Sequence, residues 1–123
     1  MPPVFSKFWV YDLTKKMLLP LSDGPGELAV PVIFSTLDTR YAMGVWSPGQ
    51  PSKGFEQAGY GRFRFEAEKV VKWNCVFRET HPTRLSAGNY SYRSYVLVGS
   101  LKNVTETMDA LHRRYLQLIP DKN

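Results

Sequence analysis

The sequence has 123 residues, of which 43% are hydrophobic, 22% charged and 14% aromatic. This length suits a single domain over residues 1–123, and the composition excludes an intrinsically disordered chain. The single cysteine, Cys75, excludes an intramolecular disulfide, and no apolar run approaches the ~20 residues of a membrane span. The segment Met1–Tyr11 contains Lys7 and lacks the pattern of a cleaved secretion signal. We therefore expect a cytoplasmic domain that does not cross a membrane.

The formal net charge of +5 comes entirely from the second half of the chain. Residues 1–61 carry five basic and five acidic side chains, whereas residues 62–123 carry eleven basic and six acidic ones. Such asymmetry is compatible with an anionic partner such as nucleic acid. However, no run of five or six like charges occurs, so the pattern favours a solvated, mildly basic surface over a dedicated nucleic-acid face.

The first half of the chain is predicted to form short β-strands separated by turns. Lys7–Asp12 is rich in aromatic and β-branched residues, and Met17–Leu21 follows after a short polar turn, so these segments predict a hairpin. Leu28–Leu37 is apolar, but Pro31 within it cannot donate a hydrogen bond to a neighbouring strand. We therefore expect that segment to lie at a sheet edge or to be split at the proline. Tyr41–Trp46 is predicted as a further strand.

Three segments in the second half show the alternation of residue types that is typical of strands. In Val70–Glu79 apolar residues at odd positions alternate with mostly polar residues at even positions, which predicts one core-facing and one solvated face. In Tyr60–Phe65 the same reasoning assigns Phe63 and Phe65 to the core face and the arginines to the solvated face. Tyr90–Val98 is predicted as the last strand.

One helix is predicted near the end of the chain, beginning at Asn103 and ending at Pro120. Asn103 can cap the first turn, and Glu106 three residues later can complete a capping box. Apolar residues at helical spacing predict one buried stripe, made of Val104, Met108, Leu111, Tyr115 and Leu118. The chain is thus predicted to be of the α+β class, an antiparallel sheet of six to seven strands with the C-terminal helix packed on its apolar face. The alternative is a two-sheet sandwich, and unpaired sheet edges make a homodimer a further hypothesis.

Several catalytic and cofactor-binding motifs are absent from the sequence. Gly59-Tyr60-Gly61 lacks the third glycine of a dinucleotide-binding fingerprint and leads into a predicted strand. Ser47 lacks the glycine two residues earlier that the serine hydrolase motif requires, and the proline after it has no N–H for an oxyanion hole. Two histidines and one cysteine are too few for a closed zinc site of these ligands. We therefore predict no cofactor and no metal site.

A cysteine–histidine catalytic pair is also disfavoured. Cys75 shares its predicted strand face with Trp73 and Phe77, which indicates a thiol that packs in the core as a small hydrophobe. His81 lies six residues later, about 20 Å away along an extended chain. At that distance the imidazole cannot activate the thiol.

The polar face of the predicted sheet gives the leading hypothesis for function. If the three alternating strands are neighbours, their polar side chains merge into one patch. Guanidinium and amide groups bind hydroxyl or carboxylate oxygens, and aromatic rings cover the apolar faces of sugars. The predicted function is non-covalent binding of a small polar molecule, carbohydrate-like or anionic, with the Gly/Pro-rich loop Ser47–Gly59 as a lid. The predicted ligand-binding residues are Trp46, Arg62, Arg64, Lys72, Asn74, Arg78, Glu79, His81, Arg93 and Tyr95.

Other functional classes stay open as alternatives. Single-stranded nucleic acid would need exposed aromatic rings for base stacking, and the placement of Phe63 and Phe65 on the core face counts against it. A protein-interaction or structural subunit would use the polar helix face with His112, Arg113 and Arg114. Enzymatic activity stays undecided, because no two candidate acid–base residues have a spacing that forces them together.

Overall fold

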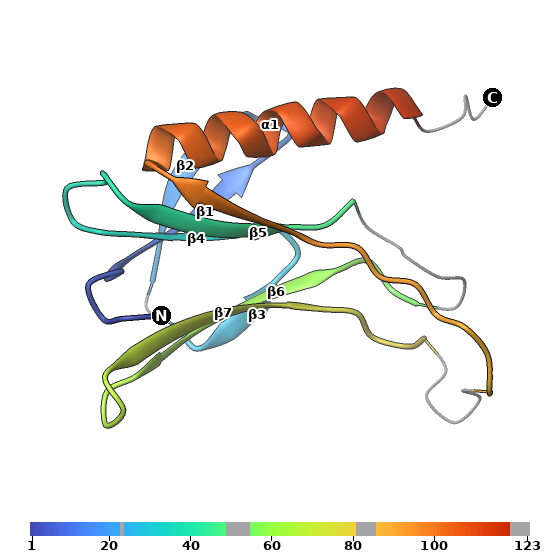
Figure 1. Ribbon diagram of the computed structural model, residues 1–123, viewed down its shortest axis with the longest axis horizontal. Coiled ribbons are helices and arrows are strands. Elements are labelled where there is room, and N and C mark those ends of the chain that lie inside the picture. Colours follow the sequence, from blue (N-terminus) through green and yellow to red (C-terminus); the bar gives the residue numbers. More distant parts are fainter. Residues whose placement is uncertain (23, 49–54, 81–85, 119–123) are drawn as a thin grey trace.

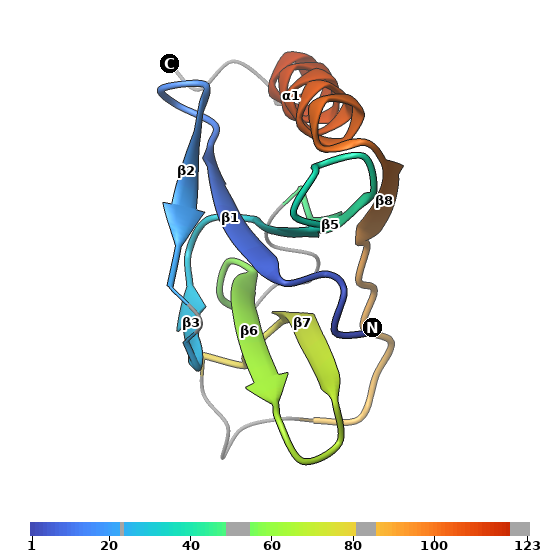
Figure 2. The same ribbon diagram turned by 90° about the vertical axis from the view of Figure 1, so that its left-hand side faces the viewer.

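The computed structural model describes residues 1–22, 24–48, 55–80 and 86–118 (Figure 1). Within these ranges eight strands form two antiparallel sheets, and one C-terminal helix packs on the larger sheet. The layers follow in the order helix, five-stranded sheet, three-stranded sheet (Figure 2). The predicted α+β class with a C-terminal helix is therefore confirmed, and the strands are divided between two sheets.

The five-stranded sheet contains the first hairpin and the three strands that pack against the helix. Its strands, in spatial order, are β2 (Met17–Leu21), β1 (Lys7–Asp12), β4 (Val32–Ser35), β5 (Ala42–Trp46) and β8 (Tyr95–Gly99). The predicted hairpin is confirmed, with Phe8 opposite Leu21 and Asp12 opposite Met17. The Asp12 carboxylate accepts hydrogen bonds from two backbone N–H groups of the turn, each 3.0 Å long, which closes the hairpin.

Pro31 splits the apolar segment, as predicted, but does not place it at an edge. The strand β4 begins directly after this proline and lies between β1 and β5 in the middle of the sheet. All four residues of β4 are buried. Because Pro31 precedes the strand, its missing N–H removes no hydrogen bond from the ladder, and its carbonyl accepts one from Tyr11 N at 3.2 Å.

The three-stranded sheet lies on the side of the larger sheet opposite the helix. Its strands, in spatial order, are β3 (Gly26–Leu28), β6 (Gly59–Phe65) and β7 (Val70–Val76). The odd positions of β7 face the larger sheet, as predicted: Val71 is buried, and Trp73 and Cys75 pack against buried residues of the core.

The predicted faces of β6 were wrong. The register places Tyr60 opposite Cys75 and Arg62 opposite Trp73, so the even positions of β6 face the larger sheet. Phe63 lies opposite Lys72 and is therefore on the outer face of the small sheet, together with Phe65. Arginine is tolerated inside because its guanidinium groups find acceptors there, as described below.

The helix α1 (Leu101–Leu118) begins two residues before the predicted start. Ser100 is its N-terminal cap, because the Ser100 hydroxyl oxygen accepts a hydrogen bond from Asn103 N at 3.1 Å. The predicted cap at Asn103 was therefore wrong, because the backbone N–H of Asn103 is itself one of the groups that the N-terminal cap satisfies. The apolar stripe is confirmed at Val104 and Met108, which are fully buried, whereas the predicted helix end at Pro120 lies outside the described residues.

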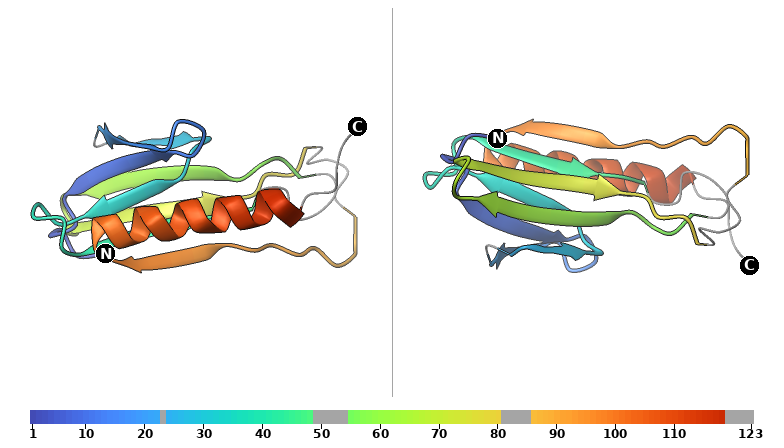
Figure 3. Two further views of the ribbon diagram at one scale, coloured as in Figure 1. Left: turned by 90° about the horizontal axis from the view of Figure 1, so that it is seen from above. Right: turned by 90° about the horizontal axis from the view of Figure 1, so that it is seen from below.

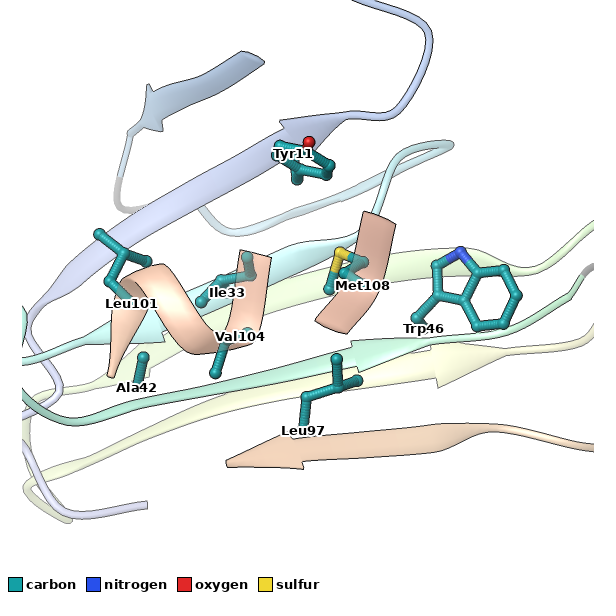
Figure 4. Packing of buried hydrophobic residues seen from close by; sticks show 8 residues of the cluster. All are labelled: Tyr11, Ile33, Ala42, Trp46, Leu97, Leu101, Val104 and Met108. Atoms are coloured by element: carbon teal, nitrogen blue, oxygen red, sulfur yellow. The ribbon is translucent and has the colours of Figure 1, made fainter. Parts of the chain in front are cut away.

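Two layers of core hold the sheets and the helix together. The helix-facing layer consists of Tyr11, Ile33, Ala42, Trp46, Leu97, Leu101, Val104 and Met108 (Figure 4). On the other face of the large sheet, buried residues such as Phe8, Phe34 and Val32 pack against the inner face of the small sheet. The central strands β4 and β5 are thus buried on both faces, and this burial supplies the main stabilisation.

The last strand is shorter than predicted and lies at the edge of the large sheet. Tyr90–Val98 was predicted as a strand, but β8 begins only at Tyr95, and Tyr90 and Tyr92 precede it as exposed residues. Seen from below, β6 and β7 cover the middle of the large sheet and β8 lies beyond them (Figure 3). As a result, Val96 and Val98 are 56% and 73% exposed.

Candidate functional site

A cavity of about 290 Å³ lies at one end of the layers, where the strand β5 ends and β6 begins. It is lined by Leu13, Ala29, Pro31, Trp46, Ser47, Pro48, Gln57, Ala58, Tyr60 and His112. These residues come from the helix, from both sheets and from the connections between strands. The cavity is therefore built by the packing of the layers against one another. Its volume is close to the lower limit of typical small-molecule sites.

Trp46 forms an aromatic wall of this cavity. The indole is buried at the end of β5, and Figure 4 shows it at the end of the helix-facing cluster beyond Met108. Tyr115 and His112 of the helix contact it, with ring centroids 5.3 and 6.5 Å from that of the indole, and Tyr95 contacts it at 5.8 Å. These contacts fix the ring, so the wall is already in place before a ligand arrives.

Tyr60 supplies a buried hydroxyl group on the opposite side, from the small sheet. Its hydroxyl oxygen accepts a hydrogen bond from Ser47 N at 2.9 Å and lies 3.4 Å from the Ser47 carbonyl oxygen. Burial raises the pKa of Tyr60 to about 12, so the phenol is neutral at physiological pH. This hydrogen bond also joins the end of β5 to the small sheet at the base of the cavity.

The remaining polar groups of the cavity are the imidazole of His112 and the amide of Gln57. His112 is half-buried against Trp46, whereas Gln57 is exposed at the rim. The described residues that line the cavity include neither lysine nor arginine. The arrangement can therefore hold an uncharged ring against the indole and offer it hydrogen bonds from amide, imidazole and hydroxyl groups.

Three of the predicted site residues lie at or beside this cavity. Trp46 lines it, and Tyr95 contacts the far side of the Trp46 ring. Arg93 donates a hydrogen bond from Nη1 to the Tyr115 hydroxyl at 3.1 Å, and the Tyr95 and Tyr115 hydroxyls are hydrogen-bonded to each other. The hydrogen bonds from Tyr95 and Arg93 lower the pKa of Tyr115. Arg93 and Tyr95 thus support the aromatic wall from outside.

Three other predicted site residues lie together on the outer face of the small sheet. Lys72, Asn74 and Arg78 occupy alternate positions along β7 and its extension. Asn74 Oδ1 accepts a hydrogen bond from Gly61 N at 2.9 Å. Arg78 forms an ion pair across β6 with Glu27 of strand β3, with Nε 3.3 Å from Oε2.

Arg62 and Arg64 do not join that face, so the predicted merging of the polar faces was wrong. Arg62 is only 8% exposed, and its Nε and Nη2 donate hydrogen bonds of 2.9 Å to the carbonyl and hydroxyl oxygens of Ser22. Arg64 lies over the Phe8 ring at 4.8 Å and donates to the Ser6 carbonyl at 2.9 Å. Both guanidinium groups connect the two layers, which is why the alternation of β6 is reversed.

The last two predicted site residues lie near the end of β7. Glu79 forms an isolated bridge with Phe55, and one of its carboxylate oxygens is buried. His81 lies outside the described residues. The thiol of Cys75 faces the core, and burial raises its pKa to about 11, which is the opposite of what a nucleophile requires.

Sequence reasoning missed Tyr60, Gln57 and His112 as site residues. A signal was present for His112, which follows Met108 by four residues and precedes Tyr115 by three, and so lies on the flank of the buried stripe. No comparable signal marks Tyr60, because its role depends on a hydrogen bond to a residue 13 positions earlier.

Among the described residues no group of three or more His, Cys, Asp or Glu side chains could hold a metal ion. No helix in the described ranges is both long and apolar enough to cross a membrane. The chain matches no protein-family model, no curated protein and no solved structure.

Proposed function

We propose that this domain binds a small, uncharged, ring-shaped molecule with several hydroxyl groups, such as a sugar, non-covalently in the cavity beside Trp46. The observation that carries the proposal is a cavity of about 290 Å³ with one fixed aromatic wall and a few polar groups. Apolar walls with few converging polar groups are the usual composition of a small-molecule site. The ring of the ligand stacks on the indole, and His112 and Gln57 bind its hydroxyl groups.

The lining residues also favour an uncharged ligand over an anionic one. Carboxylates and phosphates are normally held by arginine or lysine side chains, and neither type occurs among the cavity-lining residues in the described part of the chain. Arg62 and Arg64, which were predicted to bind a carbohydrate-like or anionic ligand, have their guanidinium groups in contacts between the layers. The proposed ligand is therefore neutral.

The test is a thermal-shift screen of neutral sugars, sugar acids and nucleosides, followed by titration of tryptophan fluorescence. A ligand at 100 times its Kd stabilises the folded state by about 2.7 kcal/mol. For this domain, that stabilisation corresponds to a rise in Tm of roughly 8–15 °C. A shift with neutral sugars supports the proposal, and a screen in which no neutral ring compound raises the Tm refutes it.

A pair of alanine-to-leucine substitutions tests the location. Ala29 is exposed at the cavity rim, and Ala110 is exposed on the helix and does not line the cavity. We expect Ala29→Leu to block the mouth and weaken ligand binding at least tenfold, and Ala110→Leu to leave the Kd unchanged. Equal affinity in both variants would place the ligand elsewhere.

A further inference from the structure

The outer face of the small sheet carries an aromatic surface that the sequence did not predict. We call it the outer aromatic face and define it by Gly61, Phe63 and Phe65 of β6 and Lys72 and Asn74 of β7. It points away from the large sheet, at the bottom of Figure 2, and no other described element covers it. Phe65 is 41% exposed, and Lys72 is also exposed.

The two phenyl rings lie nearly parallel to each other. Their centroids are 6.2 Å apart and their planes differ by 14°. A Cβ atom built on Gly61 would lie 3.0 Å from Cε2 of Phe63, so the far end of this ring lies over the glycine and leans along the strand. Because Gly61 has no side chain, it leaves room for this orientation. The result is a pair of aligned aromatic rings on an open sheet surface.

A cation and an amide lie next to these rings on the neighbouring strand. The ammonium group of Lys72 lies over the Phe63 ring, 6.0 Å from its centroid. The Asn74 amide uses its oxygen to accept from Gly61 N, so its NH₂ group is the part left to meet a ligand. Three carboxylates lie near this face: Glu66 and Glu68 are in the turn between β6 and β7, and Glu27 of β3, opposite Gly61, forms an ion pair with Arg78.

We propose that the outer aromatic face binds single-stranded nucleic acid, a function separate from small-molecule binding in the cavity. Two successive unpaired bases stack on Phe63 and Phe65, and Lys72 contacts the phosphate between them. The ring spacing of 6.2 Å is nearly twice the ~3.4 Å separation of stacked bases, so it suits a strand pulled out of its helical stack. The charge of the protein, +5, favours a polyanion over a neutral polymer.

This placement removes the objection that the sequence raised against nucleic acid. That objection was that both phenylalanines of β6 are needed in the core. In the structure the inward positions of β6 are filled by Tyr60, Arg62 and Arg64 instead. The ring of Phe65, which is exposed, and that of Phe63, which is half-buried, therefore lie outside the core clusters on the open side of the small sheet.

The experiment measures the fluorescence anisotropy of labelled twelve-nucleotide oligo(U) and oligo(dT), and of a duplex control, at 50 and 200 mM salt. We expect both single strands to bind and the duplex to bind much more weakly. Removal of an aromatic ring on which one base stacks lowers the affinity by about 5- to 150-fold, and we expect Phe65→Ser to show such a loss. The matched control is Leu37→Ser, because Leu37 is also an exposed apolar residue but lies in the connection between β4 and β5 of the large sheet.

Two further measurements keep the result interpretable. Lys72→Ala, a change at an exposed residue, should reduce the slope of log K against log salt by about 0.7. His112→Ala in the cavity should leave oligonucleotide binding unchanged, so failure of this proposal is separate from failure of the cavity proposal. Absence of binding at 50 mM salt, equal affinity for the duplex, or equal affinity of Phe65→Ser and Leu37→Ser would each overturn the proposal. Binding of an insoluble polysaccharide instead, lost in Phe65→Ser, would also overturn it in favour of a glycan surface.

Discussion

Gly44→Ala is expected to push the helix away from the large sheet and to destabilise the protein. Gly44 lies in the middle of β5, where the helix crosses closest to the sheet. A Cβ at this position would lie 3.1 Å from both Ile33 Cγ1 and Val104 Cγ1, and 3.3 Å from Met108 Cε. Ordinary contacts of such carbons are about 3.5–4.0 Å, so three neighbours are too close at once.

The loss of stability in Gly44→Ala depends on how little these three neighbours can move. Ile33, Val104 and Met108 are each at most 1% exposed, so none can turn its side chain into solvent. Adding a methyl group to a well-packed core costs about 1–3 kcal/mol, and replacing glycine by alanine in a strand returns about 0.5–1 kcal/mol of conformational entropy. The midpoints of these two ranges give a net loss of about 1 kcal/mol, which lowers the Tm of a domain of this size by roughly 3–6 °C.

Calorimetry or urea unfolding of four proteins tests this reasoning: wild type, Gly44→Ala, Val104→Ala and the double variant. Val104→Ala removes one of the clashing methyl groups, so the double variant should be more stable than the sum of the two single changes by about 0.5–3 kcal/mol. A Gly44→Ala protein as stable as wild type, or strictly additive effects, would refute the claim that Gly44 sets the distance between helix and sheet.

Four other predictions follow from individual side chains. The Cys75 thiol, with its raised pKa of about 11, should resist alkylation at pH 7.5 in the native protein and react at once in 6 M guanidinium; rapid native labelling would contradict its burial. Tyr60→Phe removes the hydrogen bond that the Tyr60 hydroxyl oxygen accepts from Ser47 N and should lower the free energy of unfolding by about 0.5–1.5 kcal/mol in urea titrations. The folded pKa of Tyr60, about 12, lies above its ordinary value near 10, so its contribution is full below pH 10 and is lost between about pH 10 and 12; Tyr60→Phe should remove that part of the alkaline decline in Tm. Arg62→Ala should lower stability by about 1.5–3 kcal/mol without changing ligand affinity at the cavity, whereas a change in Kd alone would restore Arg62 as a binding residue.

Alternation predicted the faces of β7 but failed for β6, and the reason lies in the residues themselves. Val71, Trp73 and Cys75 leave only one face of β7 apolar enough for a core. In β6 both parities carry aromatic residues, so the pattern alone does not decide which face is buried. The arginines decide which face of β6 is buried. Arg62 donates to Ser22, just after β2, and Arg64 donates to Ser6, just before β1, and the sequence alone does not place these residues near β6.

The pairing of β6 with β7 in their hairpin also decides which face of β6 is buried. A four-residue turn between β6 and β7 pairs Phe65 with Val70 and therefore Phe63 with Lys72. Since residues paired across two strands lie on the same face, the solvated side of β7 fixes the solvated side of β6. Reading the two strands together would have placed the phenylalanines outside. The cavity was harder to foresee, because its lining comes from segments as far apart as Leu13 and His112.

The pairing of the edge strand β8 with β5 determines when the core can close during synthesis. β8 pairs with β5 across an intervening stretch of nearly fifty residues, whereas the β1–β2 and β6–β7 hairpins are local. On a ribosome the hairpins therefore emerge and pair while the face that contains Ile33 and Trp46 is still bare. Only the arrival of residues 95–118 covers that face and adds His112 to the cavity. The nascent chain consequently exposes this apolar face until residues 95–118 have left the exit tunnel, and during that interval the face is available to a chaperone.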